Sequence, residues 1–273
     1  MKRSIKLWAV LFALVSLCLV FAGCDSGSSD SSDPTPVLSE DALSGVFSVS
    51  NDNGTTITKI HFSKGNLQAT IDETGVPTAW KFAENQFDCI GANKANTTIG
   101  SVAGDIDLFG WSTEATNYGI NTSTNDSDYS EDFKDWGKAI GDGNTWRTLS
   151  NEEWSYLLNT RDSASSLKKC GVTVCGKDNC LILAPDNFTE TIADSYDATA
   201  WSAAEAAGLV CLPAAGFRFG SSVDFVVSNG YYWSATPIDV DGAYYLCFNS
   251  SNADMYDNGR YFGRSVRLVC GEN

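Results

Sequence analysis

The stretch of residues 146–154, WRTLSNEEW, determines how the middle of the chain folds. Within it, Ser150 stands three residues before Glu153, the spacing of a capping box in which each side chain binds the backbone N–H of the other residue. The tryptophan that ends the stretch, Leu157 and Leu158 have the spacing of one apolar helix face. The sequence therefore predicts a helix over residues 150–158 that buries this face.

Shorter elements are predicted on both sides of this helix. A second helix is expected over residues 200–207, with Thr199 as its N-cap and Gly208 after its end. Runs rich in β-branched and aromatic residues between glycine-rich loops predict strands at 57–62, 181–184, 210–213, 231–234 and 264–269, the last of them half-buried. We therefore expect an α+β fold with small antiparallel sheets, two main helices and long loops.

Several short motifs follow one another in a fixed order along residues 45–270. After WRTLSNEEW come LPAAGFR at 212–218, YWSAT at 232–236 and GRSVRLV at 263–269, while FSKGNL at 62–67 and DLFGW at 107–111 precede it. This ordered set resembles the formylglycine-generating-enzyme branch of the C-type lectin fold. The resemblance implies that residues 43–273 form one C-type lectin-like domain.

Residues 230–269 combine a framework with irregular positions. The framework residues are Ala243, Tyr244, Leu246, Phe248, Met255, Arg260 and Gly263. The positions between them use residues that arise when adenines of an AAC or AAT codon are replaced, and include no Lys, Glu, Gln or Trp. This alphabet resembles the variable region of proteins diversified by a diversity-generating retroelement. An ordinary turn-rich hairpin uses similar residues and is the alternative.

The resemblance implies a surface-displayed protein whose C-terminal segment binds varied protein or carbohydrate ligands on another surface. Tyrosines in this segment offer rigid contact area, and its Asn, Ser, Asp and Gly adapt their hydrogen bonds, as in antibody combining sites. The predicted ligand-binding residues are Tyr231, Ile238, Asp239, Val240, Asp241, Tyr245, Cys247, Asn249, Ser251, Asn252, Asp254, Tyr256, Asp257, Asn258, Tyr261 and Phe262. Trp233 is instead expected to point into the core. An adhesin of this fold that is never diversified is an alternative.

The N-terminus has the pattern of a bacterial lipoprotein signal. Three cationic residues precede an apolar stretch at 7–21 that is short for a membrane span, and small residues precede Cys24. We expect residues 1–23 to be the signal peptide and Cys24 to carry the lipid anchor. A plain secretory signal is the alternative. Residues 24–42, rich in Ser, Asp and Pro, predict a solvated tether, so the expected location is extracytoplasmic, at the outer membrane and cell surface.

The chain is strongly acidic, with a formal charge of −16. Removal of the cations Lys2, Arg3 and Lys6 with the signal makes this −19. Such a charge repels nucleic acid and anionic headgroups, so neither is an expected partner, and the lipid is the expected membrane contact. We expect the domain to be a monomer.

Catalysis is the rival function for a fold of this kind. The resemblance implies that an enzyme of the formylglycine-generating type would use a cysteine pair with copper, for which Cys247 and Cys270 are the candidates. However, the Arg-Gly-Gly-Ser-Trp and Gly-Asn-Val-x-Glu-Trp elements of those enzymes do not occur in the sequence. The single histidine, His61, falls in a predicted strand, where a structural role is expected. We therefore predict no catalytic residue.

The cysteines and aspartates do not form a recognisable metal motif. Cys170, Cys175 and Cys180 surround a predicted hairpin with its turn at 176–179, and are expected to be buried thiols or to include a Cys175–Cys180 bridge. Their spacing is wider than that of a zinc knuckle. The aspartates that could supply calcium ligands are Asp126, Asp128, Asp239 and Asp241. The motifs of calcium-binding lectins are absent, so we expect no metal or other cofactor.

Overall fold

Helix α2 (Asn151–Ser155) begins where the sequence predicts it. Glu153 N–H donates to Ser150 Oγ at 3.1 Å and Ser150 N–H donates to Glu153 Oε2 at 2.9 Å, which confirms the capping box. The helix continues as a π-helical turn, η3 (Tyr156–Thr160), and strand β6 (Trp146–Thr148) precedes it. These elements belong to a computed structural model that describes residues 39–140 and 146–271.

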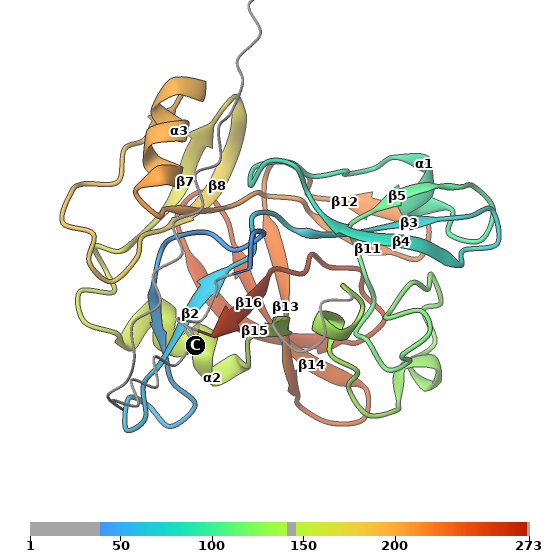
Figure 1. The fold of residues 1–273 in the computed structure, drawn as a ribbon. Coiled ribbons are helices and arrows are strands. Elements are labelled where there is room, and N and C mark those ends of the chain that lie inside the picture. Colours follow the sequence, from blue (N-terminus) through green and yellow to red (C-terminus); the bar gives the residue numbers. More distant parts are fainter. Residues whose placement is uncertain (1–38, 141–145, 272–273) are drawn as a thin grey trace, which may run out of the picture. The chain divides into compact units, whose positions relative to one another are not determined.

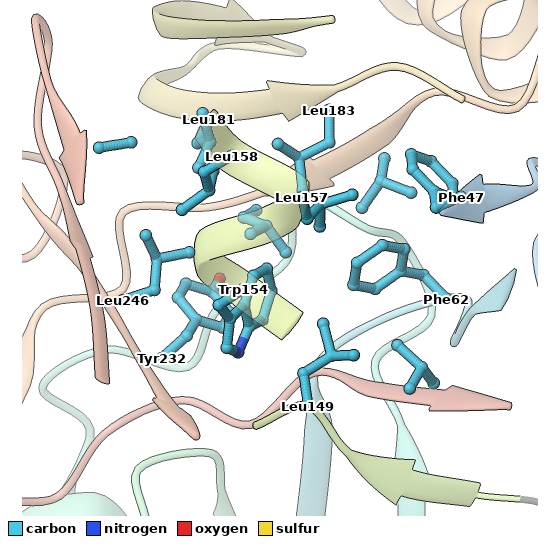
Figure 2. Packing of buried hydrophobic residues seen from close by; sticks show 14 of the residues in the cluster. Phe47, Phe62, Leu149, Trp154, Leu157, Leu158, Leu181, Leu183, Tyr232 and Leu246 are labelled. Carbon is cyan, nitrogen blue, oxygen red and sulfur yellow. The ribbon is translucent and has the colours of Figure 1, made fainter. Parts of the chain in front are cut away.

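The apolar face of this helix forms the centre of the first hydrophobic cluster. Trp154, Leu157 and Leu158 are completely buried. Figure 2 shows them surrounded by side chains of other elements, with Phe47 and Phe62 on one side and Tyr232 and Leu246 on another. Those elements include β1 (Phe47–Val49), β2 (Thr58–Phe62), β8 (Lys177–Leu183), β13 (Gly230–Pro237) and β14 (Gly242–Phe248). Because this face packs against strands of several sheets, α2 holds those sheets together. Truncation of such a buried tryptophan lowers the free energy of unfolding by about 3 to 5 kcal/mol.

A four-stranded sheet in the order β1-β2-β16-β6 brings the two ends of the domain together. Its strand β16 (Leu268–Gly271) pairs antiparallel with β2 and β6. The prediction of a half-buried strand at 264–269 was wrong in extent and burial. Arg264 instead forms an isolated bridge with Phe109 and Ser265 with Tyr232, and residues 263–270 are all buried. Arg264 and Arg267 made this segment look like a strand with one solvent-exposed face, but both side chains are buried.

A second region contains the sheet β10-β8-β7-β9 and helix α3 (Ala198–Ala206), which lies beside β7 and β8 in Figure 1. The other strands are β7 (Lys168–Val174), β9 (Ser195–Tyr196) and β10 (Val210–Leu212). Trp201 of α3 packs in the hydrophobic cluster of this region. The predicted N-cap Thr199 was wrong, because Asp197 is the N-cap and its Oδ1 accepts from Ala200 N–H at 2.8 Å.

The predicted turn at 176–179 was also displaced. Strand β8 already begins at Lys177, and the two residues between the strands, Cys175 and Gly176, have φ angles of 48° and 80°. Two successive positive φ angles suit the twist of a tight hairpin, and glycine takes the second one without strain. The hairpin itself was predicted correctly.

The remaining strands surround an aromatic cluster. Strands β3 (Leu67–Ile71), β4 (Pro77–Phe82) and β5 (Gly104–Ile106) form one sheet, with helix α1 (Lys94–Thr97) next to β5. Trp111, Trp136, Trp146 and Trp233 are buried in this second cluster, so the expectation for Trp233 is confirmed. The short helices η1 (Asp126–Tyr129) and η2 (Trp136–Lys138) lie in the long connection before β6.

The architecture is α+β, as predicted, with mostly small antiparallel sheets and few helices (Figure 1). In the described part of the chain, the first β-bridge joins Ala42 to Ser63, close to the expected start of the domain at residue 43. His61 is buried, with Nδ1 2.9 Å from the carbonyl oxygen of Leu43, and so has a structural contact. The C-type lectin-like assignment stays a prediction.

Candidate functional site

Strands β13, β14 and β15 (Ala253–Gly259) form an antiparallel sheet with two different faces. One face packs Tyr232, Leu246 and Phe248 into the first hydrophobic cluster. At Gly230 a Cβ atom would lie 2.0 Å from the ring of Phe248, so this position requires glycine. Because successive side chains of a strand point to opposite faces, the alternate residues form the second face.

The second face carries six of the predicted ligand-binding residues, and we call it the display face. Its members are Tyr231, Tyr245, Cys247, Asp254, Tyr256 and Asn258. The strand register places Cys247 between Tyr231 and Asp254, and Tyr245 opposite Tyr256. Cross-strand neighbours of this kind lie about 5 Å apart at Cβ, close enough to contact one ligand together.

Nine of the other ten predicted residues lie in connections, whereas Asp257 lies in β15 opposite Tyr244, on the face away from the display face. Residues 238–241 join β13 to β14 at one end of the sheet, whereas residues 249–252 join β14 to β15 at the opposite end, about 20 Å away by strand length. Asn249 Oδ1 accepts from the N–H groups of Ser251 at 2.9 Å and Asn252 at 3.1 Å. Asn249 thus closes its own turn. The structure separates these three residues from the 238–241 connection.

Burial divides the predicted residues from the framework. Ten of the sixteen predicted residues are exposed, five are half-buried, and Tyr245 is buried. Five of the seven framework residues are buried, and Tyr244 and Met255 are half-buried. Tyr245, which is 8% exposed, forms the floor of the display face rather than its surface.

Arg264 lies under this floor. Its guanidinium carbon is 3.6 Å from the ring centre of Tyr245 and 4.1 Å from that of Trp233. Burial lowers the pKa of Arg264 to about 10, so the group stays charged at neutral pH. Its Nε and Nη1 atoms have no hydrogen-bond partner among the described residues. The charge is therefore stabilised mainly by aromatic rings, a cation–π arrangement.

An acidic hollow of about 340 Å³ opens beside the 238–241 connection. It is lined by Asp239, Asp241 and Asp257, which the sequence predicted for the site, and by Asp126 from helix η1. Tyr261 and Asn258 complete its wall. Three of the four aspartates proposed as calcium ligands, Asp126, Asp239 and Asp241, thus come together. Within residues 39–140 and 146–271, however, no group of three or more His, Cys, Asp or Glu has the geometry to hold a metal ion.

Sequence reasoning missed an aromatic neighbour of the display face. Strands β11 (Phe217–Phe219) and β12 (Ser222–Asp224) form a hairpin outside the segment 230–269. Phe217 contacts Tyr231, with ring centres 5.2 Å apart, and Phe262 at 5.3 Å. The only sequence signal was a set of large apolar residues in a glycine- and serine-rich stretch, which is too short to predict a core element.

The candidate redox cysteines lie in different sheets. Cys247 is a half-buried member of the display face, and burial raises the pKa of its thiol. Cys270 is a buried residue of β16, where it pairs with His61 and Trp146. Cys175 and Cys180 carry free thiols in this structure, so the predicted bridge between them is not formed.

Residue Cys24, the signal peptide 1–23 and nearly all of the predicted tether 24–42 lie outside the described residues. In the part of the chain that the structure describes, no helix is both long and apolar enough to cross a membrane.

The comparisons with known proteins identify one matching family. A model of the domain of unknown function DUF8237 matches residues 154–269, from the last turn of α2 to β16. This range is less than half of the chain, and it includes the display face, the β11–β12 hairpin and Arg264. No curated protein and no solved structure matches the chain.

Proposed function

We propose that this chain is a non-enzymatic, lipid-anchored ligand-binding protein with a C-type lectin-like fold, whose segment 231–262 is diversified by a retroelement. The observation that carries the proposal is the agreement between two patterns. The residue alphabet separates framework from arbitrary positions, and burial separates nearly the same two sets.

The physical conditions for diversification support this reading. Substitutions at exposed positions usually change the free energy of unfolding by less than about 0.5 kcal/mol, so such positions can vary without loss of the fold. The framework residues between them, among them Leu246, Phe248 and Gly263, contact the core or leave no room for a larger side chain. The sheet can therefore present many different surfaces on one unchanged backbone.

Arg264 supports tolerance even at the buried position 245. The residue alphabet supplies Tyr and Phe, which stack on a guanidinium, and Asp, Asn and Ser, which accept hydrogen bonds from it. Nε and Nη1 of Arg264 have no partner among the described residues and are available for such acceptors. A fixed cation under a variable position can thus accommodate several different neighbours.

The decisive test of diversification is the DNA downstream of the gene. We expect a near-copy of the sequence encoding residues 230–269 and an adjacent reverse-transcriptase gene. Differences should fall at adenines of AAC or AAT codons that align with positions such as Ile238, Asp239, Cys247 and Tyr261. If no copy exists, or if the differences avoid adenines, the retroelement part of the proposal fails.

A library experiment tests the display role in the protein itself. One library randomises Asp254, Tyr256 and Asn258, and a matched library randomises Leu246, Phe248 and Ala253 of the same sheet. We expect most members of the first library and few members of the second to reach the surface of a display host. Equal losses in both libraries would contradict the proposal.

A further inference from the structure

The β11–β12 hairpin presents apolar side chains next to the display face. Phe219 is 46% and Phe225 is 55% exposed. Phe225 stacks on Phe217 with ring centres 5.7 Å apart, and Phe219 lies 5.5 Å from Phe262 and 5.9 Å from Tyr261. Because Phe217 also contacts Tyr231, the rings form one continuous surface. We call Phe217, Phe219 and Phe225 the fixed patch, since they lie outside the segment predicted to vary.

The backbone holds part of this patch in an unusual conformation. Phe225 has a φ angle of 60° and Val227, which is 47% exposed, has one of 68°. Large and β-branched residues rarely adopt this left-handed region. The segment is fixed by hydrogen bonds from Val227 N–H to Ala214 O at 2.8 Å and from Asn229 N–H to Phe225 O at 3.0 Å. The exposed phenylalanine therefore belongs to a defined surface.

The segment that carries the patch exposes negative charges and no positive ones. In residues 178–271, all of which the structure describes, the only Lys or Arg residues are Arg218, Arg260, Arg264 and Arg267, and each is at most 5% exposed. Exposed aspartates occur at 224, 239, 241, 254 and 257. The segment 95–133 contains no Lys or Arg, and its Asp126 lines the acidic hollow. The display face and the fixed patch thus combine aromatic side chains with exposed carboxylates. Cations lie near part of this surface, since Lys168 interacts with Asp254 and Lys94 belongs to helix α1, which contacts β12.

We propose that the fixed patch is an invariant half of the ligand-binding surface, and that its partner is a protein surface in which Lys or Arg residues surround an apolar group. This inference rests on the proposed function and specifies its ligand. Apolar side chains of the partner cover Phe219 and Phe225, its cations face the aspartates, and arginine can also stack on Tyr256 and Tyr261. The variable residues then select among such partners, while the fixed patch contributes to every complex.

The test uses the full chain in a neutral detergent and three synthetic peptides of equal length, with binding measured by fluorescence polarisation. The first peptide combines Arg and Lys with Trp and Leu. The second replaces the cations by Asp and Glu, and the third replaces the apolar residues by Ser. We expect the first peptide to bind about tenfold more tightly than the others, and its affinity to fall as salt screens the charges. Equal binding of the acidic peptide, or no binding of the first, would overturn the proposal.

Variants separate this inference from the proposed function. The double substitution Phe219→Ser/Phe225→Asn should weaken binding of the first peptide about tenfold. Asn is favoured at the φ of residue 225, so the thermal midpoint should not fall by the amount expected for a packing defect. The matched control Ile57→Ser/Val76→Ser removes side chains that are 43% and 55% exposed elsewhere, and should leave binding unchanged.

A third variant, Asp254→Ser/Tyr256→Ser, reports on the display face. If it weakens binding while the Phe219→Ser/Phe225→Asn variant does not, the display face binds ligand and the fixed patch has no part in it. If neither variant weakens binding of the first peptide, both proposals lose support. Salt-independent binding of a neutral oligosaccharide such as chitotetraose, with no binding of the basic peptide, would assign the surface to glycans and overturn the inference.

Discussion

Arg267 and Arg264 lie three residues apart and are both buried, yet their surroundings differ completely. Arg267 donates to Asn66 Oδ1 at 3.0 Å and to the carbonyl oxygens of Ser63 at 3.2 Å, Gln86 at 3.1 Å and Cys211 at 2.9 Å. Arg264 instead lies between the rings of Trp233 and Tyr245, with two nitrogens that have no hydrogen-bond partner among the described residues. One arginine connects four segments of the scaffold, and the other supports the display face.

The difference shows how one chain can combine a fixed and a changeable region. Hydrogen bonds to backbone carbonyls demand one geometry, so the surroundings of Arg267 cannot vary. Contacts between a cation and aromatic rings are less directional, and they allow replacement of one ring by another group. We therefore expect the scaffold around Arg267 to be sensitive to substitution and the display region around Arg264 to be tolerant.

The largest expected effect is that of Arg267→Met. It leaves three buried carbonyl groups and an amide oxygen without their donor, and each unsatisfied group costs about 1 to 3 kcal/mol. We expect the free energy of unfolding, measured by urea denaturation, to fall by about 4 kcal/mol. A loss below about 1 kcal/mol would show that the hydrogen bonds of Arg267 contribute little to the stability of the scaffold.

The scaffold should also respond to pH through Asp107, two residues before the Phe109 backbone that pairs with Arg264. Asp107 accepts from Ile90 N–H at 2.7 Å and Asn96 Nδ2–H at 2.8 Å, and burial raises the pKa of its carboxyl to about 6. Because the pKa of Asp107 in the folded state lies above its ordinary value of 3.8, its contribution to stability is complete below pH 3.8 and is lost as the pH rises through 6.

The measurement is the free energy of unfolding of the wild type and of Asp107→Asn between pH 4 and pH 8. Relative to the variant, the wild type should lose up to about 3 kcal/mol over this interval, since each pKa unit corresponds to about 1.4 kcal/mol. If the free energy of unfolding changed with pH in the same way in both proteins, Asp107 would not titrate as expected.

A smaller effect is expected for Arg264→Met. The substitution loses cation–π contacts worth about 2 kcal/mol in a desolvated site, but the two nitrogens without partners lose no hydrogen bond. We expect a loss of about 2 kcal/mol, half of that for Arg267→Met under the same conditions. Equal losses for the two variants would break the comparison, because Arg264 would then be as constrained as Arg267.

The smallest effect is expected at the surface of the display face. Tyr256→Ser and Asp254→Ser should each change the free energy of unfolding by less than about 0.5 kcal/mol, because both side chains are exposed. Trp154→Ala is the matched core control, with a loss of about 3 to 5 kcal/mol. A display-face loss above about 2 kcal/mol would show that these positions support the fold.

Local chemistry allowed several elements to be predicted. The capping box at Ser150 and Glu153 involves residues three apart, so the α2 start could be read from the sequence. The cap of α3 and the turn before β8 were displaced by a few residues, because Asp197 and Thr199 are both good caps and glycine suits either turn position. Local signals identified the presence of these elements more accurately than the residues at which they begin.

The candidate site was predicted in part. The alphabet of segment 230–269 separated Leu246 and Phe248 from Asp254 and Tyr256, and the structure places these pairs on opposite faces of one sheet. It did not indicate that position 245 is covered or that Phe219 lies beside Phe262. Those relations join residues far apart in the chain, and no local pattern encodes them.

The sequence by itself determined the capped helix, the α+β class, the acidic charge and the division of the C-terminal segment into framework and arbitrary positions, because each depends on residue type and short spacing. Only the tertiary structure decided the environments of Arg264 and Arg267. Both are arginines in the run GRSVRLV, and packing against Trp233 and Tyr245 or against Ser63, Gln86 and Cys211 gives them different roles. Long-range packing determines which groups surround a buried charge, and therefore what that charge can do.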